Sequence, residues 1–291
     1  MDRLPNELVT MILKNLDLTD LLNCSLASSR FLILTERILP GLTSLRIALA
    51  DCPCLANSFE KNAVVQICQC NHHGAREFMK LLPSLVSVTS SLEIEDELVK
   101  NCVSDQHIAN LLTNCAGAPI TRLALSKCDF EKVQPWTVAL LSQFDRLEDI
   151  ELDGCKFNVP ESLLIRSLST SFATLKSLDL SNSKQVTDKF ARSVSRCCPH
   201  LETFVVSGCS CISTFTVLSL IEATFFRMQD MLIVHMERTG FCPDELAKYM
   251  RSPLVANKEE WRLSPAAIPI GYDRPAVLAE HRRARCLLIY C

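Results

Sequence analysis

The chain has 291 residues, of which 48% are hydrophobic, and it carries a formal net charge of −3. This length and composition are typical of a folded protein of about two domains and exclude a disordered chain. The slight acidity gives no reason to expect nucleic-acid binding, which favours basic surfaces.

Sixteen cysteines raise the question of the redox compartment. The N-terminus has neither the basic start nor the apolar run of a signal peptide. The longest apolar stretch, 214–226, is interrupted by Glu222 and is shorter than the roughly 20 residues of a membrane span. We therefore expect a cytoplasmic and/or nuclear protein without membrane contact, whose thiols stay reduced and act as small core residues.

The first predicted element is a short helical module over residues 4–31. Pro5 suits the first turn of a helix, and Leu8, Ile12 and Leu16 recur at helical spacing. A second apolar run follows, so the segment predicts a helical hairpin. Such a hairpin is too small to be stable alone and needs the rest of the chain or a partner.

This segment resembles an F-box. The resemblance rests on the L-P-x-E-L opening at Leu4, I-L-x-x-L at Ile12, D-L-L at Asp20, and the closing Arg30-Phe31, where Phe replaces the more usual Trp. It implies docking on a Skp-type adaptor and, through it, on the cullin scaffold of an SCF-type ubiquitin ligase. The implied docking residues are Leu4, Pro5, Leu8, Ile12 and Leu16. The alternative is an ordinary helical cap for the repeats that follow.

Four later stretches align without gaps on the pattern L-x-x-L-x-L-x-x-C/N. They begin at Ile120, Leu147, Leu175 and Leu201, so their spacings are 27, 28 and 26 residues. Alternate side chains of a strand face one way, so the L-x-L pair predicts a strand with a buried face. The Cys position is expected to turn inward, and the remainder of each unit predicts a helix, as at 160–168, 186–194 and 214–226.

These motifs resemble the cysteine-containing class of leucine-rich repeats. Residues 197–202, Cys-Cys-Pro-His-Leu-Glu, are similar to the lead-in between such repeats. The resemblance implies an α/β fold: a horseshoe solenoid with one strand and one helix per repeat, closest over 114–236 and looser over 42–113. The predicted organisation is a helical module, a solenoid and a Pro-containing cap or tail, at residues 1–40, 41–252 and 253–291.

The strand positions that flank the L-x-L residues are predicted to face solvent, on the side where solenoids bind partners. They include Ala124 and a charged set: Glu93, Glu95, Arg122, Asp149, Glu151, Asp153 and Asp179. The crowded acids predict a protein substrate with a basic surface. A merely solvated acidic face is the alternative.

The tail after Ser252 loses the repeat period and is punctuated by prolines. Three arrangements are compatible with this pattern: folding back on the acidic face, capping the last repeat, or partial disorder.

No catalytic, cofactor or metal site is predicted. Cys52-Pro-Cys54 and Cys68-Gln-Cys70-Asn-His72-His73 contain zinc-ligand residue types, but zinc sites prefer Cys-x2–4-Cys spacing. No phosphate-binding loop or nucleophile motif occurs. The sequence therefore predicts a non-catalytic substrate-recognition adaptor. The alternatives are a leucine-rich-repeat scaffold without a ligase role and, further away, a zinc-binding protein or a Cys-dependent enzyme.

Overall fold

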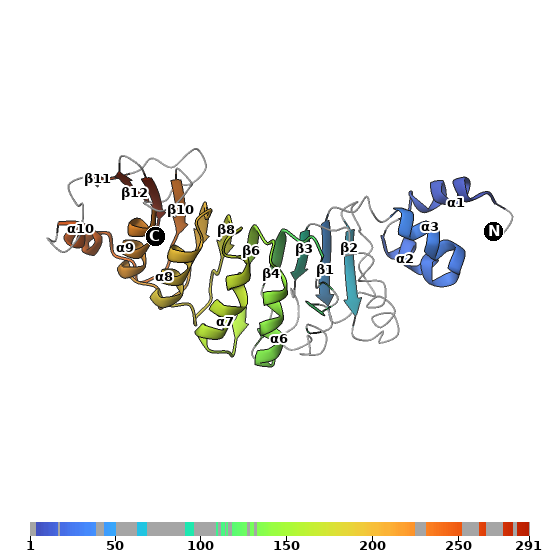
Figure 1. The fold of residues 1–291 in the computed structure, drawn as a ribbon, viewed down its shortest axis with the longest axis horizontal. Helices are drawn as coiled ribbons and strands as arrows, with labels where there is room; N and C mark the ends of the chain where they lie inside the picture. Colours follow the sequence, from blue (N-terminus) through green and yellow to red (C-terminus); the bar gives the residue numbers. More distant parts are fainter. Residues whose placement is uncertain are drawn as a thin grey trace.

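The structure is a computed structural model. It describes residues 4–16, 18–38, 44–50, 63–68, 91–95, 109, 112–113, 115, 118–126, 129–130, 133–224, 231–251, 262–265, 276–281 and 284–290. A group of helices at the N-terminal end is followed by a long sheet with helices along one side (Figure 1). The predicted mixed α/β fold with a short helical N-terminal region is thus confirmed.

The helices and strands follow one another in a regular order. The helices are α1 (Asn6–Leu13), α2 (Leu18–Ala27), α3 (Ser29–Ile38), α6 (Pro135–Ala139), α7 (Glu161–Leu168), α8 (Asp188–Cys197), α9 (Thr214–Thr224) and α10 (Pro243–Arg251), with 3-10 turns at η2 (Leu140–Gln143) and η3 (Ser169–Ser171). The strands are β1 (Ser44–Ala50), β2 (Ala63–Cys68), β3 (Ser91–Glu95), β4 (Arg122–Ser126), β5 (Asp129–Phe130), β6 (Asp149–Glu151), β7 (Lys156–Phe157), β8 (Ser177–Asp179), β9 (Thr203–Val205), β10 (Met231–His235), β11 (Arg262–Pro265), β12 (Ala276–His281) and β13 (Ala284–Ile289).

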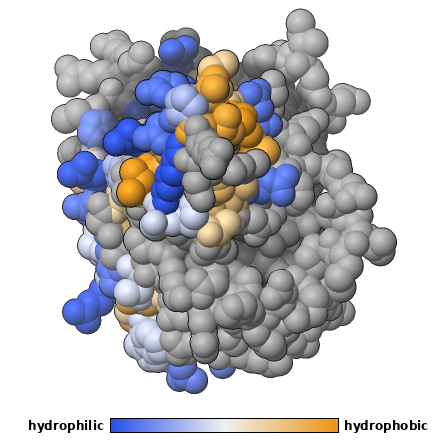
Figure 2. All heavy atoms as spheres, turned by 90° about the vertical axis from the view of Figure 1, so that its right-hand side faces the viewer, coloured by the Kyte–Doolittle hydropathy of each residue, from blue (hydrophilic) through white to orange (hydrophobic). Residues whose placement is uncertain are grey.

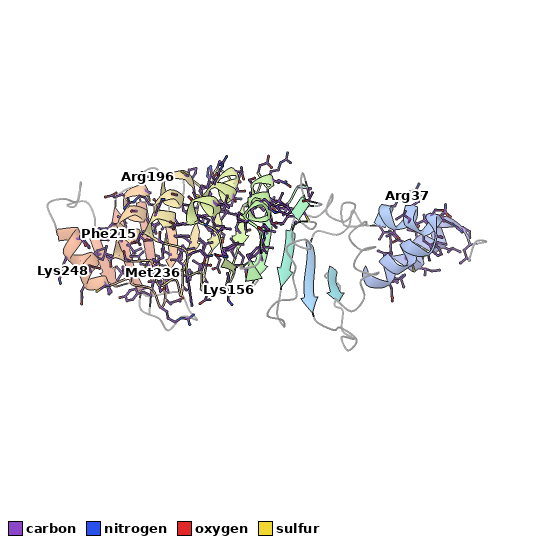
Figure 3. The ribbon with its side chains drawn as sticks, turned by 90° about the horizontal axis from the view of Figure 1, so that it is seen from below. Arg37, Lys156, Arg196, Phe215, Met236 and Lys248 are labelled. Carbon is purple, nitrogen blue, oxygen red and sulfur yellow. The ribbon has the colours of Figure 1, made fainter. Side chains whose placement is uncertain are left out.

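One sheet runs through most of the molecule, in the order β11-β12-β13-β10-β9-β8-β6-β4-β3-β1-β2. From β2 to β13 all neighbouring strands are parallel, whereas β11 and β12 are antiparallel. Parallel neighbours need a crossover on one side of the sheet. From β4 onward, helices α6 to α10 supply these crossovers, and they lie next to one another along that side (Figures 1 and 3).

The first leucine of each L-x-L pair forms a continuous row across the sheet. The pairing register joins Leu92, Leu123, Ile150, Leu178, Phe204 and Val234 in that order. The described side chains of this row, from Leu123 onward, are at most 1% exposed. The second apolar position is buried as well, at Leu125, Leu152, Leu180 and Val206. The L-x-L prediction is therefore confirmed for the four aligned stretches, because both positions of each of these pairs are buried in the core.

A left-handed residue follows each of β6, β8, β9 and β10 and turns the chain away from the sheet. The four residues are Gly154, Asn182, Gly208 and Arg238, with φ between 54° and 74°. Glycine and asparagine adopt this conformation most easily. At Gly208 space matters too, since a Cβ atom there would lie 2.4 Å from the Oδ1 of Asn182. The conformation repeats once per unit, which keeps successive units in register.

The cysteine of the motif points inward just after this turn. The Cys155 thiol donates to the carbonyl oxygen of Leu125, and the Cys209 thiol donates to that of Leu180 at 3.1 Å. Each bond ties one unit to the preceding strand, as the motif predicts. The third unit has Ser183 at this position, and its shorter side chain leaves a buried Oγ without a hydrogen-bond partner.

Successive helix starts are connected by a chain of polar contacts, which we call the cap relay (Glu161, Thr187, Asp188 and Ser213). The Glu161 carboxylate accepts from the backbone N–H and the hydroxyl of Thr187, at 2.9 and 2.6 Å, and the Thr187 hydroxyl accepts from the N–H of Lys189 to cap α8. Asp188 in turn accepts from the N–H and hydroxyl of Ser213, at 2.8 and 2.6 Å. The Ser213 hydroxyl accepts from the first turn of α9. Each helix start therefore orders the next one.

The N-terminal region has one more helix than the predicted hairpin. After α2 ends, the Ser28 hydroxyl accepts from the N–H of Phe31 at 3.2 Å and so satisfies a free donor at the start of α3. The predicted hairpin lacks this third helix, because its start at Ser28 depends on a side-chain cap and not on apolar periodicity. Buried Val9, Leu13, Leu21 and Leu34 bring the three helices together.

The described part of the tail continues the sheet. β13 pairs in parallel with β10, and β12 and β11 then add two antiparallel strands. The described tail strands thus lie beyond β10 at one end of the sheet, and the cap, fold-back or disorder of residues 253–291 stays a prediction. Among the described residues, no helix has both the length and the hydrophobicity that crossing a bilayer requires.

Candidate docking surfaces

Helix α1 is apolar on two faces. Val9 and Leu13 are each 3% exposed and face the other N-terminal helices, whereas Leu8, Met11 and Ile12 are 47%, 63% and 47% exposed. A helix that packs on one side only normally has a polar outer face. Figure 2 views the molecule from this end and shows apolar side chains gathered on it among hydrophilic ones. Contiguous exposed apolar side chains of this kind are typical of an interaction site.

Most of the docking residues implied by the F-box resemblance lie on this outer surface. Leu4, Pro5, Leu8 and Ile12 are exposed, but Leu16 is half-buried and packs against the core. Two further residues have the same character as this set but were not among the predicted docking residues. They are Met11 on α1 and Ile33 on α3, which is 52% exposed. We call Leu4, Leu8, Met11, Ile12 and Ile33 the apolar end patch.

Sequence signals for the two missed residues differ in strength. Met11 follows Leu8 by three positions, so helical spacing alone places it on the outer face. Ile33 gave no such signal, because its exposure depends on how α3 packs against α1.

A second candidate surface lies at the strand side of the sheet. Asp149 is exposed, and Glu151, Asp153 and Asp179 are half-exposed. Glu151 and Asp179 are direct register partners on β6 and β8, so the sheet brings two of the predicted acids side by side. Glu93 and Glu95 belong to β3, whose side chains lie outside the described part of the structure; the Glu93 backbone pairs with Ala124 and the Glu95 backbone with Ser126.

Local contacts shape this acidic surface. Arg122 is paired with Glu151 across the strands, with an Nη2–Oε2 distance of 3.4 Å, and the side-chain amide of Asn182 donates to Asp153 at 2.8 Å. The prediction that Ala124 faces solvent was wrong: it is fully buried, since a single methyl group between strands about 4.8 Å apart is shielded by its neighbours.

Burial raises the pKa of Asp179 above its ordinary value, and the negative charges of Asp153 and Glu151 act in the same direction. Hydrogen bonds from Ser181 oppose this pKa shift. Because the pKa of Asp179 is higher in the folded than in the unfolded chain, the folded protein gains stability as the pH falls through the folded-state pKa. Protonation removes the cost of burying the charge and, to a lesser degree, the repulsion from Asp153 and Glu151. A nearby cation would relieve the same repulsion at neutral pH, so the site is suited to a positively charged group.

Two observations on the described residues concern metal and thiol chemistry. No group of three His, Cys, Asp or Glu side chains suited to a metal ion occurs among them. The zinc-like residues around Cys52, Cys54, Cys70, His72 and His73, and the side chain of Cys68, lie outside the described part. Burial raises the pKa of Cys115 to about 12 and that of Cys209 to about 11, which keeps both thiols protonated and weakly nucleophilic.

A comparison with protein families bears on the N-terminal helices. Residues 1–39 match the F-box-like family model. This match covers the three N-terminal helices and supports an F-box protein. F-box domains generally bind Skp-type adaptors and generally belong to adaptors of ubiquitin ligases. A search among curated proteins found no match.

Proposed function

We propose that this protein is a non-catalytic substrate-recognition adaptor of a cullin-based SCF-type ubiquitin ligase. Its N-terminal helices dock a Skp-type adaptor, which connects it to the cullin scaffold. The observation that carries this proposal is the apolar end patch, because it lies within the residues that match the F-box-like model. Burial of exposed Leu, Met and Ile side chains is a strong source of binding free energy.

We propose further that residues 41–252 form a leucine-rich-repeat solenoid and that residues 253–291 cap it. The support is the agreement between the motif spacing and the in-register parallel strands from β3 to β10. Repeats of this kind bury their apolar faces only against their neighbours, and they offer a long surface to partners. The substrate in this proposal is a protein bound on the strand side.

The proposed role requires no catalysis by the chain itself. A bound substrate is held near the ubiquitin-carrying enzyme, so the effective concentration of its lysines rises. In this role the protein needs no cofactor or metal and binds neither nucleic acid nor membrane. We place it in the cytoplasm or nucleus, where ubiquitin ligases of this type work.

Binding to a purified Skp-type adaptor tests the proposal. We expect the intact protein to retain the adaptor in a pull-down and the double variant Leu4→Ala, Pro5→Ala to lose it. The matched control is Trp136→Ala on α6, which removes another exposed apolar side chain far from the N-terminal helices. Failure of the intact protein to bind the adaptor would exclude the ligase role.

A repeat scaffold without a ligase role is the second candidate. The acidic strand surface favours it, because this surface is built without any contribution from the N-terminal helices. The two candidates share the strand-side partner and differ only in adaptor binding.

We predict that the strand-side partner is basic. In the triple variant Asp149→Lys, Glu151→Lys, Asp179→Lys, binding to Lys- and Arg-rich peptides should weaken at least about tenfold, since attraction becomes repulsion. Peptide titration at low and moderate salt measures this, with circular dichroism to confirm folding.

The control for the acidic surface carries the same change in net charge. Glu222, Asp244 and Glu245 are exposed acids on α9 and α10, and their replacement by lysine leaves the strand side untouched. Because Asp179 is half-buried, the double variant Asp149→Lys, Glu151→Lys is tested in parallel. Equal peptide binding by the strand-side and helix-side variants would show that the acids are only solvated.

A further inference from the structure

A single arginine of α3 holds the chain segment that begins α1. Nε of Arg30 donates to the side-chain Oδ1 of Asn6 at 2.9 Å, and its Nη2 donates to the backbone carbonyl oxygen of Leu4. The acceptors lie 24 and 26 residues earlier in the sequence, so these bonds connect the last of the three helices to the first. We call this pair of bonds the Arg30 clasp.

Helix electrostatics does not explain the position of this cation. The N-terminus of a helix carries partial positive charge, so a guanidinium beside the start of α1 is unfavourable on that account. Pro5, the N-cap residue of α1, contributes no side-chain hydrogen bond. A guanidinium is suited to the task because its rigid fork presents donors to two acceptors that lie in different directions.

The clasp touches the apolar end patch at both ends. Leu4, whose carbonyl oxygen accepts one bond, belongs to the patch, and Ile33 follows Arg30 by three residues on the same face of α3. The bonds therefore hold the α1 part of the patch and the α3 part in one arrangement before any partner arrives.

We propose that Arg30 is a positioning residue for adaptor docking: it fixes Leu4 beside α3, so that α1 and α3 present one preformed surface. This inference rests on the proposed function. A segment that is ordered in advance loses less conformational entropy on binding, so the affinity is higher than for a mobile segment. Arg30 acts through Leu4 and need not touch the adaptor itself.

A purely structural role of Arg30 and a positioning role predict different results for binding. If Arg30 only stabilised the helices, its loss would lower the melting temperature. The loss of adaptor affinity caused by Leu4→Ala would then be the same with and without Arg30. If Arg30 positions Leu4, the loss of adaptor affinity caused by Leu4→Ala must be smaller when Arg30 is absent. A double-mutant cycle between the two residues measures this coupling.

The experiment uses the full chain and a purified Skp-type adaptor, with affinities measured by titration calorimetry. We expect Arg30→Ala to weaken binding about tenfold, which is the scale of one lost charged hydrogen bond. Leu4→Ala should weaken binding in the wild-type background and have little further effect in the Arg30→Ala background. Asn6→Asp keeps an acceptor for Nε and should retain binding, whereas Asn6→Ala should weaken it.

The control is Arg37→Ala, which removes an exposed arginine from the last turn of the same helix (labelled in Figure 3). It should leave the affinity unchanged. Wild-type affinity in Arg30→Ala, or an undiminished Leu4→Ala effect in that background, would overturn the inference while leaving the proposed function intact. Absence of adaptor binding by the wild-type chain would instead overturn the proposed function and this inference with it.

Discussion

Replacement of Asp188 by alanine should lower the free energy of unfolding by about 3 kcal/mol, because charged hydrogen bonds contribute roughly 1.5–3 kcal/mol each and are not fully additive. Asp188 accepts three bonds from the next unit: two from Ser213 and one, at 2.6 Å, from the hydroxyl of Thr216. Thr216 is fully buried, so its hydroxyl would lose its acceptor in the protein interior. Chemical denaturation followed by circular dichroism measures the change.

The size of this effect reflects the cap relay and not the helix dipole alone. Asp188 is the first residue of α8, where the helix dipole by itself already favours a carboxylate. In the structure the same carboxylate fixes the start of α9 through Ser213. Loss of the carboxylate therefore loosens the junction between two successive units.

Asp244 offers a matched control. It lies in the first turn of α10, it is exposed, and Asp244→Ala removes the same carboxylate from a comparable helix position. The free energy of unfolding of that variant should fall by no more than about 1 kcal/mol, the scale of a helix-dipole interaction. The destabilisation caused by Asp188→Asn should lie between those of Asp188→Ala and Asp244→Ala, since the amide keeps one acceptor oxygen. Equal destabilisation by Asp188→Ala and Asp244→Ala would show that the relay contributes nothing.

Met11→Asp should weaken binding to a Skp-type adaptor at least about 100-fold. Burial of a methionine side chain contributes about 1.5–3 kcal/mol, and burial of an unpaired carboxylate adds a further penalty, while about 1.4 kcal/mol corresponds to a factor of ten. Met11 is 63% exposed, so the free protein should keep its fold. Titration calorimetry measures the affinity, and helicity is checked on the same samples.

Two further variants of α1 separate docking from folding. Lys14→Asp places the same carboxylate at the exposed C-cap residue that follows this helix and should change binding far less. Leu13→Asp places it at a buried position and should unfold the N-terminal helices, so that binding and helicity are lost together. Unchanged adaptor binding by Met11→Asp would mean that α1 is not the docking helix.

Much of the repeated architecture could be predicted from short-range patterns. The L-x-L pairs became buried strand positions, and the expected helices at 160–168, 186–194 and 214–226 appear as α7, α8 and α9 with ends shifted by a few residues. The inward cysteine followed from the same register, as the thiol bonds of Cys155 and Cys209 demonstrate. These features depend on the alternation of neighbouring side chains, which a sequence displays directly.

The apolar end patch was predictable in part. Leu8 and Ile12 have the spacing of one helix face, and Leu4 and Pro5 came from the F-box resemblance; all four are exposed. Leu16 has the same spacing, yet it turns toward the core, and Ile33 is exposed without any spacing signal. Helical periodicity states which residues share a face, but it does not state whether that face meets solvent or another helix.

The sequence by itself thus determined the repeat period, the strand and helix of each regular unit, and the helical character of the N-terminal region, because each depends on residues a few positions apart. Only the tertiary structure decided which side chains of different units meet. The pairing of Arg122 with Glu151, the relay from Asp188 to Ser213, and the Arg30 clasp join residues 24 to 29 positions apart. Such contacts are set by strand register and helix packing, which no local pattern encodes.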